Sequence, residues 1–470
     1  MIKRIPLLEE VLKYKEEKNL LFSMPGNKSG RAFLIDEEGK RFADNMGYLD
    51  ITEVDPLDNL HYPEGVILEA EQLLAETYGV KKAFFVVNGS TAGNMASIFA
   101  AFSEGDEILV ERNCHKSIYN ALILRKLKVI YIEPVVDQEK GIFLPPDYEK
   151  INKALKMAKN PKGIILTYPN YFGITYDVEK ILQELKKKGM KVILDAAHGA
   201  HFGISEKLPK AIYNIPDYVV VSAHKTLPAL TQGSYLLVNN MEDDIEFYLR
   251  AFMSTSPSYL IMSSLDYARH YLDCYGKEIY EELICKAEKW KKKINLLGKV
   301  TILDSSDLLG GYDIDKSRYL ITMPRGYSGH KLADYFRENR IQCEMSFAAG
   351  VVLILSPCND EDDFKKIYDL IEKMDLAILQ EKDNSNYVEI IPEKVLEPYD
   401  VFRKGYKNIK INESEGMVAK EFIVPYPPGI PLVCPGEKIS KETIEIVNDY
   451  LLNNRQVIGI DENEKIKVIY

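Results

Sequence analysis

The chain has 470 residues, of which 46% are hydrophobic and 28% charged, as in a folded globular protein with two or three domains; disordered and collagen-like classes are excluded. Its 71 acidic side chains outnumber 60 basic ones, for a net charge of −11, which argues against nucleic-acid or anionic-membrane binding and is compatible with a small cationic substrate. No apolar run reaches membrane-spanning length and the charged N-terminal stretch lacks a signal-peptide core, so we expect a cytoplasmic protein.

Helix-like and strand-like segments alternate from about residue 64 to residue 239. The strand-like runs are short and almost continuously hydrophobic: AFFVV, EILVE, KVIYI, GIILTY, KVILDAA and YVVVSA. Such runs, separated by helices like VEKILQELKKKG, are typical of parallel strands buried on both faces of a sheet. The pattern therefore predicts an α/β fold whose large domain holds a mostly parallel sheet.

The second half of the chain has a different pattern. Long helical patterns over 259–298 lead to a smaller unit, in which the strand-like runs VTILD, YLITMP and VVLILSP accompany the helical segment HKLADYFRENR. This unit is interpreted as a small α+β domain. A polar stretch at 382–386 has the composition of a linker, and the proline-rich segment PYPPGIPLVCPGE lies at 425–437. The predicted division is an N-terminal segment (1–60), a large cofactor-binding domain (61–275), a small α+β domain (276–381) and a C-terminal domain (382–470).

The first motif with chemical content is VVNGSTAGNMAS, in which a predicted strand ends at Val87 and a helix begins near Ala92. The turn between them contains Gly89, Ser90 and Thr91. Backbone N–H groups and hydroxyls at a helix N-terminus form an anion site, so the motif predicts a phosphate ligand. The alternative is that the two hydroxyl residues only cap the helix.

His115 follows the predicted strand EILVE. Ligands of open α/β sheets bind outside the carboxyl ends of the strands, so an imidazole here could stack on a planar cofactor. The alternative is an ordinary loop histidine whose hydrogen bonds are satisfied locally.

Asp195 ends the hydrophobic run of KVILDAAHGAHFG. A buried carboxylate needs a cationic or hydrogen-bonding partner, and the protonated nitrogen of a pyridine ring is such a partner. Asp195, His198 and His201 could instead be metal ligands, but no fourth ligand is apparent in the sequence. We therefore predict no metal. The six cysteines are scattered without a CxxC pair, which predicts reduced thiols.

Lys225 lies in SAHKTLPALTQG, at the end of the next strand-like run after Asp195. Because lysine disfavours burial, a lysine here is either a surface cation or an amine used for chemistry. Beside Ser222 and His224, at the carboxyl edge of a sheet, the amine is placed to form a Schiff base. A phosphate turn, a stacking histidine, a strand-ending aspartate and this lysine, in that order, predict a pyridoxal 5'-phosphate (PLP) site.

Seven segments extend this pattern over nearly the whole chain: MPGNKSGR, VNGSTAGN, RNCHKSIYNAL, LDAAHGAHFG, SAHKTLPALTQGSYL, STSPSYLIMSSLD and PYPPGIPLVCPGE. Together they resemble the bacterial Orn/Lys/Arg decarboxylases, in the shorter form without an extra N-terminal regulatory domain. The SAHKTLPALTQGS block is the most specific of them. The resemblance implies the PLP-dependent transferase fold type I, as in aspartate aminotransferase. It also implies active sites shared between the subunits of a homodimer or a larger homo-oligomer.

By this resemblance, Lys225 would bind PLP as an internal aldimine and Asp195 would pair with the pyridine nitrogen. His115 would stack on the ring face opposite Ala197, and His198 would lie beside the ring. The residues expected around the phosphate come from both subunits: Gly89, Ser90, Thr91, Ser222 and His224 from one, and Thr255 and Ser256 from the other.

Two stretches depart from the family pattern. The family's PGHKGG is PGNKSG here, with Asn27 in the histidine position and Ser29 in place of a glycine. This affects the expected N-terminal contacts only, because no step of the chemistry uses Asn27. The stretch DITEVDPLDNLHYP is a looser version of the family's TELPGLDDL block, so its place at a dimer interface rests on the resemblance alone.

The resemblance implies decarboxylation of a basic amino acid, with arginine, giving agmatine and CO2 for polyamine biosynthesis, as the preferred substrate. Lysine or ornithine, giving cadaverine or putrescine, are alternatives; so are another fold-type-I aminotransferase or lyase, and a non-catalytic regulator. Lys225 or His224 would return a proton to Cα. Catalytic roles are thus expected for Lys225, His224, Asp195 and His115. Two acidic residues are candidates for binding the distal cation of the substrate, Glu344 and Glu437.

Overall fold

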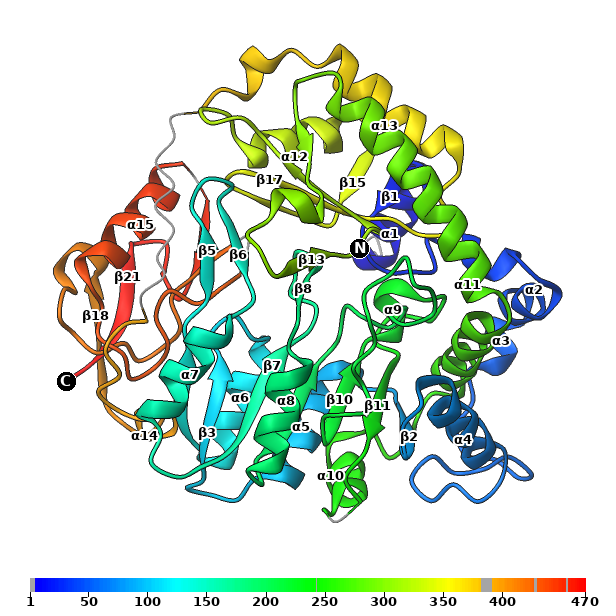
Figure 1. Ribbon diagram of the computed structural model, residues 1–470, viewed down its shortest axis with the longest axis horizontal. Helices are drawn as coiled ribbons and strands as arrows, with labels where there is room; N and C mark the ends of the chain where they lie inside the picture. Colours follow the sequence, from blue (N-terminus) through cyan, green and yellow to red (C-terminus); the bar gives the residue numbers. More distant parts are fainter. Residues whose placement is uncertain (1–4, 242, 382–390, 427–428, 454) are drawn as a thin grey trace, which may run out of the picture.

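The computed structural model describes residues 5–241, 243–381, 391–426, 429–453 and 455–470. The predicted linker at 382–386 and two residues of the proline-rich segment, 427–428, lie outside the described residues. The chain forms a large α/β unit, a smaller α+β unit next to it, and a C-terminal unit that lies beside both (Figure 1). No helix in these ranges is long and apolar enough to cross a lipid bilayer.

A seven-stranded sheet forms the centre of the large unit, in the order β2-β11-β10-β9-β7-β3-β4. The run from β10 to β4 is parallel throughout, whereas β11 pairs antiparallel with both β10 and β2. The prediction of a mostly parallel sheet is therefore confirmed. The strands are β2 (Lys82–Val86), β3 (Glu107–Glu111), β4 (Lys128–Ile132), β7 (Pro161–Thr167), β9 (Lys191–Asp195), β10 (Tyr218–Val221) and β11 (Ser234–Val238).

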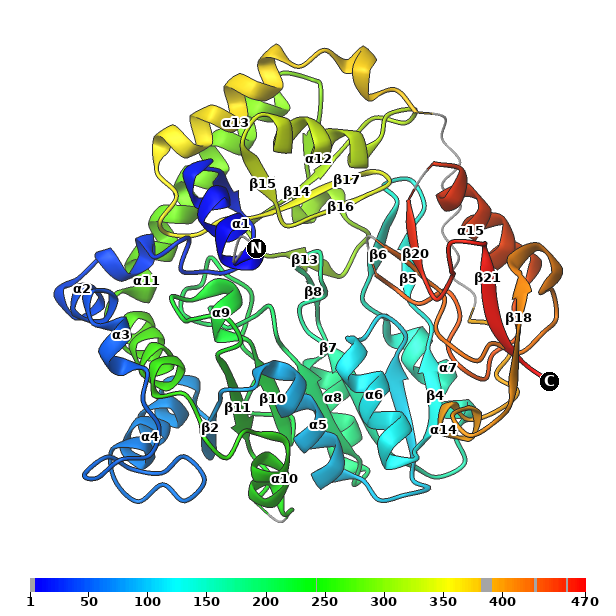
Figure 2. The same cartoon turned by 180° about the vertical axis from the view of Figure 1, so that it is seen from behind.

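Helices cover both faces of this sheet. Helices α7 (Tyr148–Met157) and α8 (Glu179–Lys187) lie on the face toward the viewer in Figure 1, and α5 (Gly89–Ala101) and α6 (Lys116–Arg125) on the opposite face (Figure 2). Helix α10 (Ile245–Phe252) packs beside α5. Covered in this way, the strands need hydrophobic side chains on both faces, which explains their unbroken hydrophobic sequences.

The strand register determines which residues meet at the edge of the sheet. Val220 of β10 lies opposite Asp195 of β9, and Asp195 lies opposite Thr167 of β7. Parallel strands end at the same edge, so Asp195 and the segment that follows β10 come close together there. That segment is the short helix α9 (Ala223–Thr226), and the edge faces the small unit (Figure 1).

The small unit contains a four-stranded antiparallel sheet in the order β12-β14-β17-β16. Helix α11 (Tyr259–Asn295) joins it to the large unit as one helix of 37 residues, which runs through the expected boundary at 275/276; the domain division remains a prediction. Its other elements are β12 (Thr301–Ile302), β14 (Arg318–Thr322), β15 (Ile341–Cys343), β16 (Met345–Phe347), β17 (Gly350–Ile354), α12 (Gly329–Glu338) and α13 (Glu361–Lys373).

The C-terminal unit has its own hydrophobic core, around Ile423, Val433 and Ile466. A buried ion pair joins it to the large unit: the Arg112 guanidinium, after β3, donates to both carboxylate oxygens of Glu437 at 2.7 Å. Its elements are α14 (Pro398–Val401), β18 (Tyr406–Lys410), β19 (Val424–Tyr426), α15 (Lys441–Leu452), β20 (Gln456–Ile458) and β21 (Lys465–Ile469).

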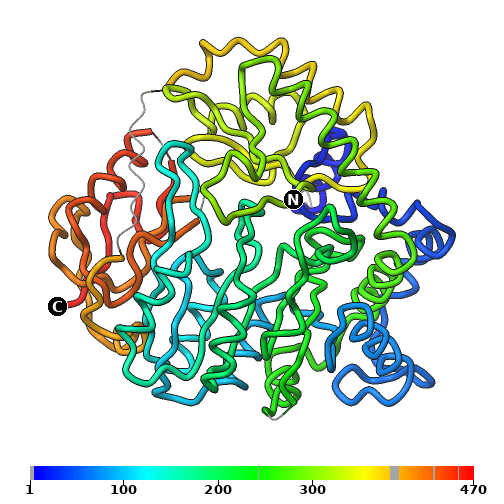
Figure 3. Tube along the Cα trace, in the orientation of Figure 1, coloured from blue at the N-terminus to red at the C-terminus, as the bar shows by residue number. Residues whose placement is uncertain are grey.

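The N-terminal segment packs on both larger units. Strand β1 (Leu20–Phe22) pairs in parallel with β15 of the small unit, and the blue N-terminal trace lies there in Figure 3. Just after β1, Gly26 N–H donates to the His224 carbonyl at 2.7 Å, and a Cβ on Gly26 would lie 2.5 Å from the Leu227 carbonyl oxygen. The remaining helices and strands are α1 (Pro6–Glu16), α2 (Glu37–Asp44), α3 (Met46–Leu49), α4 (Val66–Tyr78), β5 (Val135–Asp137), β6 (Ile142–Leu144), β8 (Ile174–Tyr176) and β13 (Tyr312–Ile314).

Candidate active site

Lys225 lies in α9, half-buried, at the carboxyl edge of the large sheet. Its Nζ lies 3.0 Å from Nε2 of His198, which is on the loop after β9. Burial lowers the pKa of Lys225 to about 8, although the charges of Asp195 and Glu344 raise it. About a tenth of the amine is therefore neutral at pH 7, far more than for a lysine in water. The environment suits an amine that acts as a nucleophile.

Asp195 ends β9 and is almost completely buried. Its Oδ1 accepts a hydrogen bond from the Ala197 N–H (3.1 Å), and its Oδ2 accepts one from Nδ2 of Asn94 (3.0 Å). Among the described residues, no lysine, arginine or histidine forms an ion pair with this carboxylate. A buried carboxylate with free lone pairs and no counter-ion is suited to a cationic ligand group, such as the protonated nitrogen of a pyridine ring.

Asn94 lies in the candidate site but is not among the residues predicted from the sequence. It lies on α5, is fully buried, and donates both to Asp195 and to the Ser117 hydroxyl (3.0 Å). In the sequence, Asn94 stands out only as a single amide among the mostly small side chains of the helical segment GSTAGNMAS.

The predicted phosphate turn forms the N-terminus of α5. Gly89 has a φ of +78°, and the N-cap is Asn88 without a side-chain capping bond, so Ser90 and Thr91 do not serve as the cap. The Ser90 hydroxyl lies 2.5 Å from that of Ser222 and 3.0 Å from that of Ser234, while Thr91 is exposed. Hydroxyls gathered at a helix N-terminus can donate to a phosphate once one binds.

Ser234 was not anticipated from the sequence. It is the first residue of β11. Because β11 runs antiparallel to both β10 and β2, its first residue lies at the edge where the parallel strands end. In the same region, His224 Nδ1 lies 2.8 Å from the Gly233 carbonyl oxygen. Because a carbonyl only accepts, Nδ1 carries a proton and Nε2 remains available.

His115 is the N-cap of α6. Its Nδ1 accepts from the Ser117 N–H at 3.2 Å, and the ring is exposed on the single chain. Ala197 is buried, and its N–H donates to Asp195. Since Asp195 and Lys225 both act electrostatically on His115, the three predicted residues lie in one neighbourhood.

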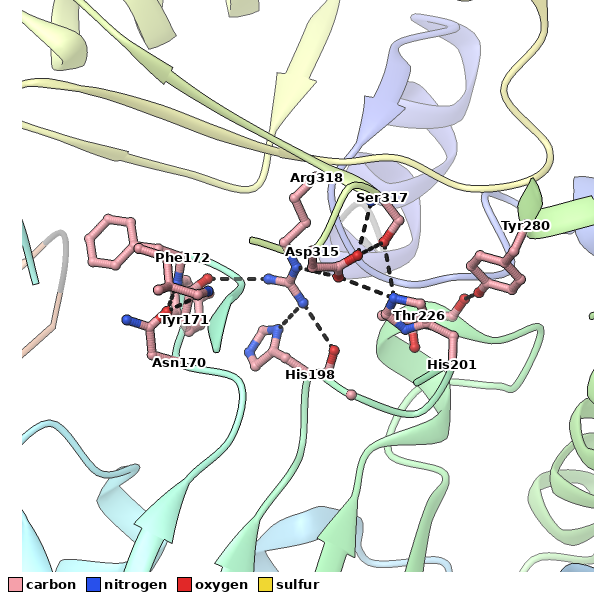
Figure 4. A network of polar contacts seen from close by, with 12 residues as sticks. Asn170, Tyr171, Phe172, His198, His201, Thr226, Tyr280, Asp315, Ser317 and Arg318 are labelled. Carbon is pink, nitrogen blue, oxygen red and sulfur yellow. Dashed lines mark hydrogen bonds and ion pairs between the residues drawn. The ribbon is translucent and has the colours of Figure 1, made fainter. Parts of the chain in front are cut away.

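His198 and His201 point to different partners (Figure 4). His198 lies between Lys225 and Arg318, and its ring packs edge-on against Tyr171, 4.8 Å between centroids. His201 is fully buried, with Nε2 3.1 Å from Oδ2 of Asp315. Within the described ranges, no group of three His, Cys, Asp or Glu side chains is arranged to hold a metal ion.

The remaining predicted residues lie farther out. Thr255 and Ser256 are exposed in the loop between α10 and α11, beside Ser254, whose N–H donates to Asn88 Oδ1 at 3.1 Å. Asn27, in the family's histidine position, is buried, and its Nδ2 donates to the Ala229 carbonyl at 3.1 Å. Asn27 therefore supports the loop that follows Lys225.

The two acidic candidates differ in availability. Both oxygens of Glu437 are bound by Arg112, and Glu437 is fully buried. Glu344 lies between β15 and β16, half-buried, and accepts from the Tyr171 hydroxyl (2.7 Å) and the Met24 N–H (2.9 Å). The charge of Glu344 raises the pKa of Lys225, and its carboxylate oxygens have further lone pairs that can accept hydrogen bonds.

Two family models match the chain. Residues 5–309 match the family described as "Orn/Lys/Arg decarboxylase, major domain", and residues 381–459 match "Orn/Lys/Arg decarboxylase, C-terminal domain". The Bacillus subtilis (strain 168) protein YaaO is 34% identical, with 98% of this chain and 97% of that protein covered. A B. subtilis arginine decarboxylase is 30% identical, with coverages of 94% and 92%.

Among solved structures, the lysine decarboxylase LdcF of Francisella novicida matches with a TM-score of 0.79 and 21% identity, over 99% of this chain and 81% of that one. A serine palmitoyltransferase from S. paucimobilis, solved with a PLP–myriocin adduct, matches with a TM-score of 0.57 and 13% identity, over 75% and 86%. The predicted fold class is confirmed.

Proposed function

Because the chain belongs to the Orn/Lys/Arg decarboxylase family, we propose that it removes the α-carboxyl group of arginine as CO2, with PLP as its cofactor, and leaves agmatine. Agmatine is a precursor for polyamine biosynthesis. The observation that carries the proposal is the pair formed by Asp195, a buried carboxylate without an ion-pair partner among the described residues, and Lys225, an amine of lowered pKa at the same sheet edge.

The residues at this edge would divide the binding of PLP among them. Lys225 would bind it covalently, Asp195 would hold a proton on its pyridine nitrogen, and His115 would cover one face of the ring opposite Ala197. The phosphate would lie at the N-terminus of α5, among Gly89, Ser90, Thr91, Ser222, His224 and the additional hydroxyl of Ser234. When bound, PLP supplies an electron sink for the electron pair that remains on Cα after CO2 leaves.

The chain's own residues would handle the protons. Asp195 would stabilise positive charge on the pyridine nitrogen, because it is a carboxylate in a water-poor site. Lys225 or His224 would return a proton to Cα: the lysine through Nζ, the histidine through Nε2 after that nitrogen has taken up a proton. His198, beside Nζ, keeps the amine in a fixed position.

Glu344 is our proposed binding residue for the distal cation of the substrate. Its charge acts on Lys225 and its oxygens have further lone pairs, whereas both oxygens of Glu437 are bound by Arg112. Tyr171 and the Met24 N–H hold its carboxylate in place, so a guanidinium or ammonium group would meet a preoriented acceptor.

The proposed assembly is a homodimer or a larger homo-oligomer, with Thr255 and Ser256 reaching the partner's site. The N-terminal helix α1 supports a partner copy, because it buries none of its residues and leaves Leu7 79% and Val11 56% exposed. Light scattering during size-exclusion chromatography checks this, with a single-chain mass as the contrary result. Six free thiols support the cytoplasm as the working compartment.

One assay tests the activity and its rivals. The purified protein with PLP is incubated separately with arginine, lysine and ornithine, and both CO2 and the amine product are measured. CO2 with agmatine from arginine is the expected result. Cadaverine or putrescine would reassign the substrate, keto-acid formation without CO2 would indicate an aminotransferase, and no turnover with any of the three would indicate a regulator.

A further inference from the structure

Arg318 reaches from the small unit into the candidate site and is held there on several sides. It begins β14, and its side chain is fully buried. Its Nε donates to Asp315 Oδ2 at 3.3 Å, one terminal nitrogen donates to the Tyr171 carbonyl at 3.2 Å, and the other donates to the His198 carbonyl at 3.2 Å (Figure 4). These bonds fix the guanidinium in one position beside His198.

The same terminal nitrogen lies 3.1 Å from Nδ1 of the His198 ring. A guanidinium has only N–H donors, so His198 Nδ1 must be the unprotonated, accepting nitrogen. In a neutral imidazole the proton then lies on Nε2, which faces Lys225 Nζ at 3.0 Å. A hydrogen bond from this Nε2–H to Lys225 Nζ requires a lone pair on Nζ, and only the neutral amine has one.

A protonated His198 is disfavoured at this position. Burial, the charges of Lys225 and Arg318, and then those of His115 and His224 hold the pKa of His198 well below its ordinary value. The Arg318 side chain remains a cation, because an arginine guanidinium is not deprotonated in proteins. Next to the Arg318 guanidinium the imidazole of His198 therefore stays neutral, and its proton lies on Nε2.

We propose that Arg318 is a positioning residue, which fixes His198 in the tautomer protonated on Nε2 and so enlarges the neutral fraction of Lys225, the form whose nitrogen bonds to the cofactor's aldehyde carbon while the aldehyde oxygen leaves as water. This rests on the proposed function, because it takes PLP as the ligand of Lys225. The effect is exerted through His198, since Arg318 donates to His198 Nδ1 and Lys225 lies at Nε2.

Other charged and titratable groups around Lys225 and His198 also affect the protonation of these two side chains. Asp195 on β9 and Glu344 from the small unit favour the charged amine, while Arg318 on β14 opposes it. His115, before α6, and His224, on α9, oppose a charge on His198. The Tyr171 ring lies against His198, and its hydroxyl is engaged by Glu344.

The test uses the full-length protein freed of PLP, in three forms: wild type, Arg318→Gln and Arg318→Lys. PLP is added, and the rate of its covalent capture is followed by its absorbance from about pH 6 to about pH 9. Without Arg318, His198 can place its proton on Nδ1 and accept from a protonated Lys225 through Nε2. We expect the midpoint of the capture profile in Arg318→Gln to rise by about one pH unit, and capture at pH 7 to slow about tenfold.

Arg318→Lys retains a positive charge and a donor, so we expect it to recover most of the wild-type midpoint. An unchanged midpoint in Arg318→Gln, with circular dichroism of the wild type, would overturn the proposal. Because no amino acid is present, this result does not depend on which substrate the enzyme uses. A failure of the decarboxylation assay with a normal capture profile would instead count against the proposed function alone.

A second measurement covers the case in which Arg318→Gln does not fold. Nitrogen-15 NMR of histidine-labelled wild-type protein without PLP reports which imidazole nitrogen carries the proton, and His198→Gln assigns the signal. A proton on Nε2 of His198 is expected across neutral pH. A proton on Nδ1, or a ring that becomes protonated on both nitrogens near its ordinary pKa of about 6.5, contradicts the proposal.

Discussion

Two buried aspartates lie near the candidate site, Asp195 at the edge of the large sheet and Asp315 beside the small sheet, and they differ in how far their charge is compensated. Asp315, beside the small sheet, accepts from Arg318, His201 and the Ser317 hydroxyl. Burial alone would raise the pKa of Asp315, but these neighbours hold it well below its ordinary value. Asp195, at the edge of the large sheet, has two neutral donors and, among the described residues, no ion-pair partner.

The charge of Asp315 is compensated by its neighbours, whereas that of Asp195 has only neutral hydrogen-bond donors among the described residues. A charge that is fully compensated within the chain contributes to the folded state, and its removal leaves its partners buried and unpaired. A buried charge without an ionic partner in the chain does not add to the stability of the fold, because its burial costs free energy, and it retains its capacity for a cationic ligand. The Asp315 cluster is therefore expected to act through structure, and the Asp195 cluster through chemistry.

The largest effect is expected at Lys225, whose amine contacts His198, the neighbour of Arg318. Lys225→Ala removes the amine that binds the cofactor, so CO2 release should be abolished, with a loss of at least about 10⁴-fold. Lys225→Arg is the matched control, because it keeps a cation but cannot form the covalent link. Full steady-state activity in either variant would refute the assignment of Lys225.

Asp195→Asn should separate activity from folding. The variant removes the charge opposite the cofactor nitrogen, and we expect CO2 release to fall by about 10³-fold. The free energy of unfolding should change by less than about 1 kcal/mol, because no ion pair is broken and the unpartnered Oδ1 of Asn94 can accept from the new amide. Denaturant unfolding of the cofactor-free protein, compared with CO2 release, checks both halves. Loss of stability without loss of activity would show that Asp195 has a structural role and not a chemical one.

Asp315→Asn should show the opposite balance. Removing this carboxylate leaves the Arg318 guanidinium buried without its counter-ion, and we expect a loss of about 3 kcal/mol in the free energy of unfolding. The depressed pKa of Asp315 adds a pH dependence. Its stabilisation is present above the unfolded-state pKa and is lost as pH falls through the lower folded-state value. An acid unfolding profile identical to that of the wild type would contradict this role.

Glu344→Gln is expected to have the smallest effect, and one that depends on the substrate. The amide keeps an acceptor for the Tyr171 hydroxyl but loses the charge, so KM for arginine should rise about tenfold with a smaller change in kcat. Norleucine, which lacks a distal cation, is the control substrate and should be affected little. Equal losses with both substrates would show that Glu344 acts on something other than the distal cation.

The large-sheet half of the site could be predicted from sequence because its residues come directly after hydrophobic runs. Parallel strands end at one edge, so Asp195, His115 and Lys225 were expected to meet without any knowledge of the tertiary structure. Their roles remain predictions. Asn94 lies in the middle of a helix and Ser234 begins an antiparallel strand, and neither position is signalled by that rule.

The small-unit half could not be predicted. Arg318 contacts His198 across 120 residues of sequence, and this contact depends on how two units pack against each other. The D-x-x-H-x-x-H spacing offered, as the alternative interpretation, a metal ion shared by Asp195, His198 and His201. The fold directs one ring toward Lys225 and the other toward Asp315, because each histidine is bound by a residue from the small unit.

Gly173 gives this long-range contact an evolutionary consequence. It has a φ of +84°, and a Cβ placed there would lie 2.4 Å from Cδ of Arg318. A larger residue at position 173 would thus displace the arginine as well as strain the turn. In an alignment of relatives, the two positions should therefore covary: glycine should be retained wherever a long cationic side chain occupies position 318, and substitutions at 173 should accompany shorter side chains at 318.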